Sequence, residues 1–457
     1  MIEGLKPYAE YKDSGAPWFG DVPAHWGVGR LGAVFGERGE TNEKREITED
    51  LSVLKDIGVI PYSEKGHIGN KKSEDVGRYK IVRPDDLVVN CMNVIIGSVG
   101  RSRYTGCLSP VYYVLKRRKP ENLPRFLELV FQHKSFQQSL VRIGNGILAH
   151  RMRIPMEKLK AELFPTPHPD EQAAIVRFLD HANRKIDGFI RAKRNLIGLL
   201  NEQKQAIIHR AVTLGLNPNA TLKPSGIPWL GDIPEHWELS RVKNEFVCLN
   251  RRRIPLSAVE RGAMTTKLYD YYGASGVIDK VESYIFDDEL LLIAEDGANL
   301  VLRNLPLAII AKGKFWVNNH AHILKPKHGN LEYLAGFMET LNYQPWISGA
   351  AQPKLTKDRL LSIALAVAPV SEQAAIVEYF TDETAPQRTA IARTEREITL
   401  MQEYRTRLTA DIVTGKLDVR EAAAKLPDLP KDAEPAPDAD AFDNELLEES
   451  ETEESHE

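Results

Sequence analysis

Cysteine is scarce in this chain, and its scarcity excludes two classes of protein. Only Cys91, Cys107 and Cys248 occur among 457 residues, and none of them form a C-x-x-C pair. An odd count of widely spaced cysteines does not build the framework of a small disulfide-rich secreted protein, and it supplies no paired thiolates for zinc. We therefore expect three buried thiols in a reducing cytoplasm.

Long apolar runs are also missing. The longest candidate, LLSIALAVAPV at 360–370, has 11 residues, well short of the roughly 18 that a membrane helix needs. The N-terminal stretch MIEGLKPYAEYKDSG has no basic start followed by an apolar core, so it is unlike a secretory signal. We expect no membrane association.

Motifs of catalysis are absent as well. Gly313-Lys314 and Gly415-Lys416 lack the upstream glycine and the following Ser or Thr of a phosphate-binding loop. We expect no G-x-G-x-x-G turn that opens a helix, and no Asn-Pro-Pro stretch of the amino-methyltransferase type occurs. His320 and His322 have no carboxylate or cysteine cluster that would complete a metal site. We expect no catalytic residue, no metal and no bound cofactor.

The charge is distributed unevenly. Residues 421–457 hold 14 Asp or Glu and 2 Lys, so the remaining 420 residues carry a net charge of +8 although the whole chain carries −4. A basic body permits nucleic-acid binding without requiring it. The tail is rich in Pro, Ala and acidic residues and poor in aromatics, a composition that predicts disorder.

What the chain does contain is a repeat. SGAPWFGDVPAHWGVGRLG at 14–32 returns as SGIPWLGDIPEHWELSRVK at 225–243, an offset of 211. PDEQAAIVRFLD at 169–180 returns as VSEQAAIVEYFT at 370–381, an offset of 201. Between these flanks, blocks of about 33–145 and 244–347 share almost no sequence. The pattern indicates one repeated structural frame that carries two different variable blocks.

The frame reads as helical. Apolar residues three and four positions apart follow both EQAAIV segments, a coiled-coil type of face. Because Pro386 suits a first turn and Thr384 can cap it, we predict a short helix and a long helix in each copy, at about 171–181 and 183–214, and at about 372–382 and 385–414. The two long helices are expected to pack on each other, although each packing only on its own block is the alternative.

Each variable block reads as strands followed by one helix, at 124–143 and 331–347. The loops between them carry basic, amide and aromatic residues that suit phosphates and base edges. The candidate DNA-contacting residues are Lys71, Lys72, Arg78, Asn90, Asn93, Arg101, Arg103, Tyr104, Arg251, Arg252, Arg253, Lys267, Tyr271, Tyr272, Asn318, Asn319 and His320.

Glu295-Asp296, at the end of LLLIAEDG, allows three interpretations. The pair could serve acid–base or nuclease chemistry, could accept hydrogen bonds from cytosine amino groups, or could simply end a strand at an Asp-Gly turn. Without a matching Glu-x-Lys, we favour the strand end. The four tryptophans of the doubled motif recur unchanged, so we interpret them as packing residues rather than as readers of sequence.

The doubled SGxPWxGDxPxHW and EQAAIV segments, with the helix ends HRAVTLGL (209–216) and TADIVTGKLDVR (409–420), resemble the DNA-sequence specificity subunit of type I restriction–modification enzymes over about residues 1–420. The resemblance implies a non-catalytic bacterial subunit that reads a split site in double-stranded DNA. It further implies two modification subunits that use S-adenosylmethionine, and two restriction subunits that use ATP and Mg²⁺.

The expected fold is α+β: two mixed α/β target recognition domains in a tandem pseudo-two-fold repeat, joined by long helices packed as an antiparallel coiled-coil spacer. The expected domains are 1–150 and 221–350 for recognition, 151–220 and 351–420 for the helical spacers, and 421–457 for the acidic tail. A protein-interaction scaffold with weak or lost DNA reading is the alternative.

Overall fold

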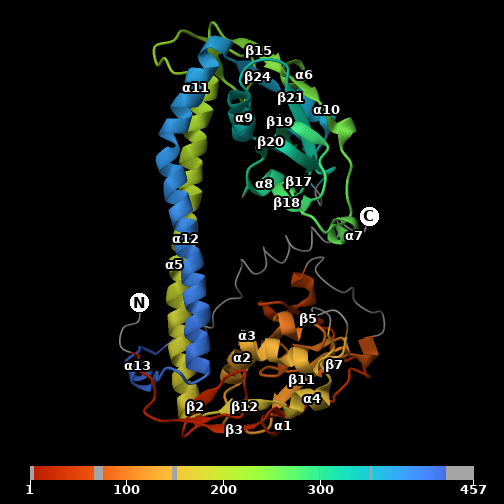
Figure 1. Cartoon of the computed structure of the whole chain (residues 1–457), viewed down its shortest axis with the longest axis vertical. Coiled ribbons are helices and arrows are strands. Elements are labelled where there is room, and N and C mark those ends of the chain that lie inside the picture. The colour runs from red at the N-terminus through yellow and green to blue at the C-terminus, as the bar shows by residue number, and fades with distance from the viewer. Residues whose placement is uncertain are drawn as a thin grey trace. The chain divides into compact units, whose positions relative to one another are not determined.

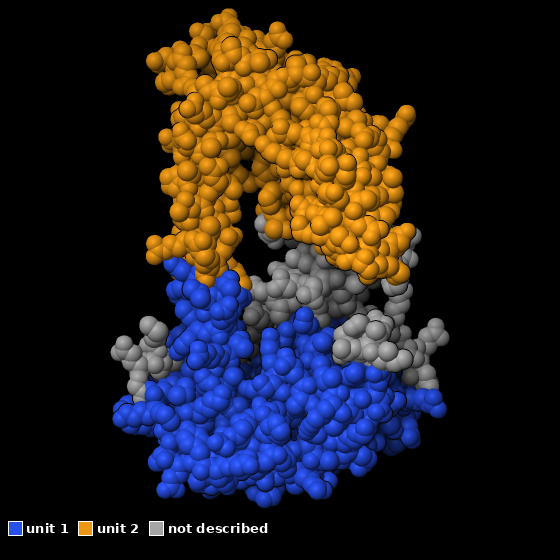
Figure 2. Space-filling model, viewed as in Figure 1, with its two compact units in different colours: residues 1–192, 397–453 blue, residues 193–396, 454–457 orange. Residues whose placement is uncertain are grey.

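The computed structural model describes residues 5–65, 76–146, 152–297, 299–303, 305–349 and 353–428. These residues form two compact units. Unit 1 comprises the described parts of 1–192 and 397–453, and unit 2 those of 193–396 (Figure 2). Among the described helices, none combines the length and the apolarity needed to cross a membrane.

The first variable block, in unit 1, is built on a four-stranded antiparallel sheet in the order β4–β11–β8–β9. These strands span Phe35–Glu37 (β4), Tyr112–Arg117 (β11), Leu87–Asn90 (β8) and Val99–Arg101 (β9). Two further strand pairs accompany it: β5 (Leu51–Leu54) with β6 (Gly58–Pro61), and β7 (Lys80–Val82) with β10 (Gly106–Leu108).

Alternation along β8 assigns the two faces of this sheet. Leu87 and Val89 join the core that contains helix α2 (Pro124–Gln132), whereas Val88 joins a second cluster with residues of β5, β6, β7 and β10. The predicted helix at 124–143 is interrupted at His133, whose backbone is extended; α3 (Lys134–Ser139) and a 3₁₀ turn follow. Sequence periodicity contained no sign of this break.

The frame of unit 1 consists of short hairpins and helical turns. Strand β1 (Tyr11–Asp13) pairs with β2 (Asp21–Pro23), and β3 (Gly27–Arg30) pairs with β12 (Leu163–Thr166). The helices α1 (Leu31–Val34) and α4 (Met156–Ala161) contact each other beside them.

The second variable block, in unit 2, has a six-stranded sheet in the order β16–β21–β19–β20–β17–β18. The strands span Phe246–Cys248 (β16), Ala321–Pro326 (β21), Phe286–Ala294 (β19), Ala308–Val317 (β20), Tyr269–Gly273 (β17) and Gly276–Val281 (β18). Only β17 and β20 pair in parallel; the other neighbours are antiparallel.

Helices and short strands complete unit 2. Helix α9 takes the place predicted for a helix at 331–347, and Asn330 caps it by accepting hydrogen bonds from the backbone of Glu332 and Tyr333. The helices are α6 (Val242–Glu245), α7 (Ala258–Ala263), α8 (Asn299–Leu302), α9 (Leu331–Thr340) and α10 (Lys357–Ser362). The strand pairs are β13 (Leu222–Pro224) with β14 (Asp232–Pro234), β15 (Glu238–Arg241) with β24 (Ala364–Val367), and β22 (Ile347–Ser348) with β23 (Lys354–Leu355).

The long helices match the prediction in the second copy only. There, α11 (Val370–Glu383) and α12 (Ala385–Val413) meet at Thr384, whose hydroxyl donates to the carbonyl of Phe380. In the first copy α5 (Pro169–Leu214) is one continuous helix of 46 residues. The predicted break near 182 is therefore wrong, because Lys185 stands where the second copy has Pro386 and nothing interrupts the ladder.

Helices α5 and α12 pack together, as predicted (Figure 1). In unit 1, Phe178 and Ala182 of α5 share a core with Leu408 and Ile412 of α12. An ion pair joins the same two helices, because the guanidinium of Arg405 lies 2.5 Å from the carboxylate of Asp187. The resulting mixed α+β fold agrees with the expected class.

Each tryptophan that closes the doubled motif is locked onto the first turn of a helix. Trp26 and Trp237 are fully buried. The indole Nε1 of Trp26 donates to Glu171 of α5 at 2.9 Å, and that of Trp237 donates to Glu372 of α11 at 3.2 Å. The predicted packing role is confirmed for this pair, which we call the tryptophan joints.

The chain's described ends meet in unit 1. The backbone N–H of Asp418 donates to the carbonyl of Lys6 at 2.8 Å. Beyond it, α13 spans Arg420–Ala424 and buries Ala423, so the first residues of the segment expected to be disordered are helical. The rest of that expected tail, 429–457, lies outside the described residues.

Candidate nucleic-acid interface

The candidate residues of the first block have different surroundings. Lys71 and Lys72 lie outside the described residues. Arg78, at the end of a 3₁₀ turn, and Arg103, after β9, are exposed. Tyr104 is half-buried against the cluster formed by β5, β6, β7 and β10. The two arginines therefore remain accessible to a polyanion.

The β8–β9 turn uses its amides internally. Asn90 is 9% exposed, and its side-chain oxygen accepts a hydrogen bond from the backbone N–H of Met92 at 3.0 Å. Asn93 is half-buried at the start of a 3₁₀ turn. Arg101 pairs with Asp85 at 2.9 Å and is only 13% exposed. Asn90 and Arg101 therefore shape the turn, whereas the side chain of Asn93 is neither largely buried nor ion-paired.

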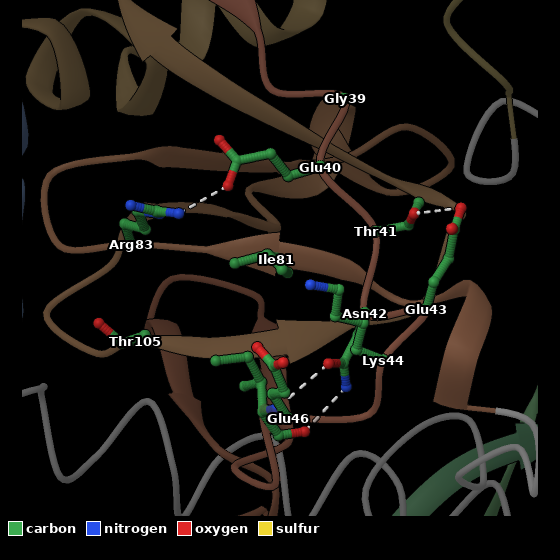
Figure 3. A pocket seen from close by; sticks show the side chains of 11 residues that line it. Gly39, Glu40, Thr41, Asn42, Glu43, Lys44, Glu46, Ile81, Arg83 and Thr105 are labelled. Atoms are coloured by element: carbon green, nitrogen blue, oxygen red, sulfur yellow. Dashed lines mark hydrogen bonds and ion pairs between the residues drawn. The ribbon is translucent and has the colours of Figure 1, made fainter.

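A pocket of about 500 Å³ opens beside β4 in the same block (Figure 3). Its lining residues are Gly39, Glu40, Thr41, Asn42, Glu43, Lys44, Glu46, Ile47, Ile81, Arg83 and Thr105. Charges of both signs face one another across it, and Arg83 pairs with Glu40 at 2.7 Å. Hydrogen bonds from Arg38, and then its charge and that of Arg83, lower the pKa of Glu40.

Asn42 fixes the loop that forms this pocket. The side chain is 2% exposed, donates to the carbonyl of Ile47 at 2.8 Å and accepts the N–H of the same residue at 3.1 Å. The pocket is thus a preformed polar hollow with hydrogen-bonding groups of both kinds. Sequence reasoning missed it, although the run GETNEKRE at 39–46 is as polar as the loops that supplied the candidates.

In the second block the three contiguous arginines have separate roles. Arg251 is exposed. Arg252 lies over the ring of Phe286, 4.6 Å from its centroid, and donates to a backbone carbonyl. Arg253 pairs with Glu295 at 2.5 Å and donates to the carbonyls of Asn319 and Ala321. Arg253 therefore ties the β20–β21 turn to the end of β19.

The turn at 318–320 is built around a buried amide. Asn318 is 4% exposed, and its side-chain oxygen accepts the N–H of His320 at 2.8 Å. Nδ1 of His320 lies 2.9 Å from the carboxylate of Asp296. Asn319, between them, is exposed. The side chain of Asn319 is the group that this turn presents to solvent.

Both carboxylates at 295–296 are engaged by cations. Glu295 is paired with Arg253 and lies 3.4 Å from Lys354. Burial acts to raise the pKa of Glu295, but the hydrogen bond from Arg253 and the nearby positive charges outweigh burial and leave that pKa lowered. Gly297 follows with a φ of +98°, a left-handed turn residue. These contacts favour the strand-end interpretation over a general base, which needs a raised pKa.

Three candidates near β17 complete the set. Lys267 is exposed and pairs with Asp279 at 2.7 Å. Tyr271 is 1% exposed, and its hydroxyl accepts the N–H of Leu256. Tyr272 packs against Phe315, and burial raises the pKa of its hydroxyl. Sequence position alone placed Tyr271 at the surface, whereas the pleat of β17 turns it into the core.

Among the residues that the structure describes, no cluster of His, Cys, Asp or Glu has the arrangement of a metal site. The exposed candidates form a short set: Arg78, Arg103, Arg251, Arg252, Lys267 and Asn319. They are cations and an amide, the groups that contact phosphates and base edges.

Comparisons with known proteins point in one direction. Residues 234–400 match the family model of the type I restriction modification DNA specificity domain. Over 110 residues the chain is 39% identical to a putative type I restriction enzyme specificity subunit of Haemophilus influenzae, covering 24% of this chain. That alignment spans 28% of the relative's length.

Solved structures extend the comparison to the fold. A chain from a study of complex assembly and conformational transition of the type I R-M system aligns over 87% of this chain and 99% of its own, with a TM-score of 0.53 and 13% identity. The type I restriction-modification S subunit from M. genitalium aligns over 89% of this chain and 97% of its own, with a TM-score of 0.33 and 14% identity.

Proposed function

We propose a function on the premise that this chain resembles the DNA specificity (S) subunits of type I restriction–modification systems. Its residues 234–400 match the model of their specificity domain. Its fold is similar to that of a chain from such a system. The chain is then a non-catalytic subunit whose two variable blocks each read one half of a split site in double-stranded DNA. It binds no cofactor itself.

This proposal rests on the observation that the tryptophan joint occurs in both copies of the repeat, whereas the variable blocks differ between the copies. The Trp26–Glu171 joint recurs as Trp237–Glu372, although the blocks that follow each tryptophan share almost no sequence. The order β4–β11–β8–β9 also has a counterpart in β16–β21–β19–β20. A repeated frame with divergent blocks is what a tandem pseudo-two-fold reader of two different half-sites requires.

The helices act as the spacer in this proposal. The 46 residues of α5 correspond to about 69 Å at 1.5 Å per residue, longer than the roughly 48 Å of the separate helix predicted at about 183–214. Two modification subunits, supplied with S-adenosylmethionine, dock on the frame, and two restriction subunits using ATP and Mg²⁺ complete the enzyme.

Lengthening the spacer tests its role. Inserting four helix-forming residues near position 195 displaces the chain beyond the insertion by about 6 Å. The gap between the half-sites should change, while the half-sites themselves stay the same. Methylome sequencing of the host reads both quantities, and an unchanged gap would reject the spacer role.

The second candidate function is a protein-interaction scaffold. It is favoured by Arg101, Arg253 and Lys267, because each of these candidate DNA contacts is already ion-paired with a carboxylate of the same chain. A DNA-binding titration of the chain with its modification subunit over a range of salt concentrations separates the two. Sequence-selective affinity with a steep salt dependence supports DNA reading. Binding that is weak and indifferent to sequence supports the scaffold.

A further inference from the structure

A run of four cations at the end of β11 stands apart from the residues discussed above. Lys116, Arg117, Arg118 and Lys119 are contiguous, and within the described residues none of the four forms an ion pair with a carboxylate. Arg117 donates instead to the carbonyls of Pro120 and Asn122, at 3.0 and 2.9 Å. The charge of this basic run is therefore held in place but not neutralised.

Arg118 and Lys116 lie over the same glycine. The Nε of Arg118 donates to the carbonyls of Gly32 and Phe35, at 2.8 and 3.0 Å. The first atoms that a Cβ on Gly36 would meet are the guanidinium carbon of Arg118 and the Cε of Lys116, at 3.7 and 3.8 Å. Two positive groups thus converge on one spot of the β4 backbone.

The sheet face of Lys116 follows from alternation along β11. Val114, two residues earlier, packs in the cluster that also contacts Tyr104. Residues two apart in a strand point to the same face, so Lys116 extends the face on which Tyr104 lies, next in sequence to the exposed Arg103. Helix α2 packs on the opposite face, in the core that holds Leu115.

The corresponding strand end of the second block carries less unpaired charge. In β21 and the residues after it, Lys325 is paired with Asp288, and His328 lies 3.1 Å from Glu245. Among the described residues, Lys327 donates to the carbonyl of Lys243 at 2.9 Å instead of pairing with a carboxylate. The first block, 33–145, holds 19 Lys and Arg against 14 Asp and Glu, whereas the second block, 244–347, holds 11 against 12. Within the described residues, four cations without a carboxylate partner lie at this strand end in the first block, against one, Lys327, in the second.

We propose that the basic run at 116–119 binds the phosphate backbone of duplex DNA beside the half-site read by the first block. Lys116 and Lys119, which are exposed, supply mobile ammonium groups, while Arg117 and Arg118 are held by backbone carbonyls and supply fixed charge. Such contacts add affinity without adding sequence preference. This inference rests on the proposed function, because it assigns a further contact of the same DNA.

The test uses the chain assembled with its modification subunit. In the variant K116Q/K119Q, two phosphate contacts are lost, which lowers the slope of log K against log salt by about 1.8. Between about 50 and 200 mM salt the variant should therefore lose roughly tenfold less affinity than the wild type. The ratio of cognate to non-cognate affinity and the methylated motif should not change. The matched control K12Q/K134Q removes two exposed lysines elsewhere in unit 1 and should keep the wild-type slope.

Three results would overturn the inference. One is a wild-type slope in the variant while binding remains selective; another is the same reduced slope in K12Q/K134Q. The third is failure of the variant to assemble with the modification subunit, which would make the basic run a protein-docking surface. Failure of the proposed function has a different signature: the wild-type complex itself would show no preference for its cognate duplex.

Discussion

Gly415, just after α12, offers a quantitative test of how the helix end is held by the doubled motif. Its φ is +78°, and a Cβ at this position would lie 2.4 Å from Cδ of Pro23 and 3.2 Å from the ring of Trp26. The left-handed conformation alone costs a non-glycine residue about 1–2 kcal/mol. Forcing a methyl group against Pro23 adds roughly 1–3 kcal/mol of overpacking. Gly415→Ala should therefore destabilise unit 1 by about 2–5 kcal/mol.

Two matched glycines separate conformation from contact. Gly20 has a φ of +63°, and a Cβ added there would meet nothing within 4 Å, whereas Gly215 has a φ of +70° and its added Cβ would lie 3.1 Å from the ring of Trp237. Gly20→Ala should cost only the conformational part, about 1–2 kcal/mol. Gly215→Ala should fall between Gly20→Ala and Gly415→Ala, because its contact is less severe.

Urea unfolding followed by tryptophan fluorescence measures this order, since the joints contain Trp26 and Trp237. The midpoint should fall least for Gly20→Ala and most for Gly415→Ala, with unchanged m-values. Equal midpoints for Gly20→Ala and Gly415→Ala would refute the reasoning, because they would mean that the end of α12 does not press against Pro23 and Trp26.

Two other predictions concern unit 2. Arg253→Ala should lower the free energy of unfolding by about 3 kcal/mol or more, because Glu295 is left largely buried without its main partner. Arg251→Ala should leave the urea midpoint unchanged and weaken DNA binding. A lowered midpoint in Arg251→Ala together with an unchanged midpoint in Arg253→Ala would contradict both assignments. Burial lowers the pKa of His322 and of His209 below 6.5. The unfolded chain therefore takes up protons first as the pH falls, and the stability that these neutral histidines contribute is present above about pH 6.5 and is lost below it. The midpoint of the His209→Gln variant should accordingly fall less than that of the wild type between about pH 7.5 and 5.5, and an equal fall would contradict the assignment.

The sequence predicted the frame well because its signals are local and repeated. The break at Thr384 follows from Pro386, and the continuous α5 could have been anticipated from Lys185 at the matching position. The resemblance is supported over residues 234–400, which match the specificity-domain model. The interruption at His133 carries no comparable signal.

The interface was harder to predict because residue type does not reveal where a side chain finds its partner. Arg253 and Glu295 are 42 positions apart, and only the folded sheet brings them together. Asn318 looked like a free amide on a loop, yet it bonds within its own turn. The basic run at 116–119 ends strand β11 (Tyr112–Arg117), and its sequence does not show whether carboxylates distant in the chain neutralise it.

Methylome sequencing after a block exchange tests the central claim most directly. Residues 33–145 are replaced by the corresponding block of a related chain, with both tryptophan joints left intact. Separate reading of two half-sites predicts a methylated motif in which one half changes while the other half and the gap are retained. A motif changed in both halves, or one not changed at all, would contradict the account.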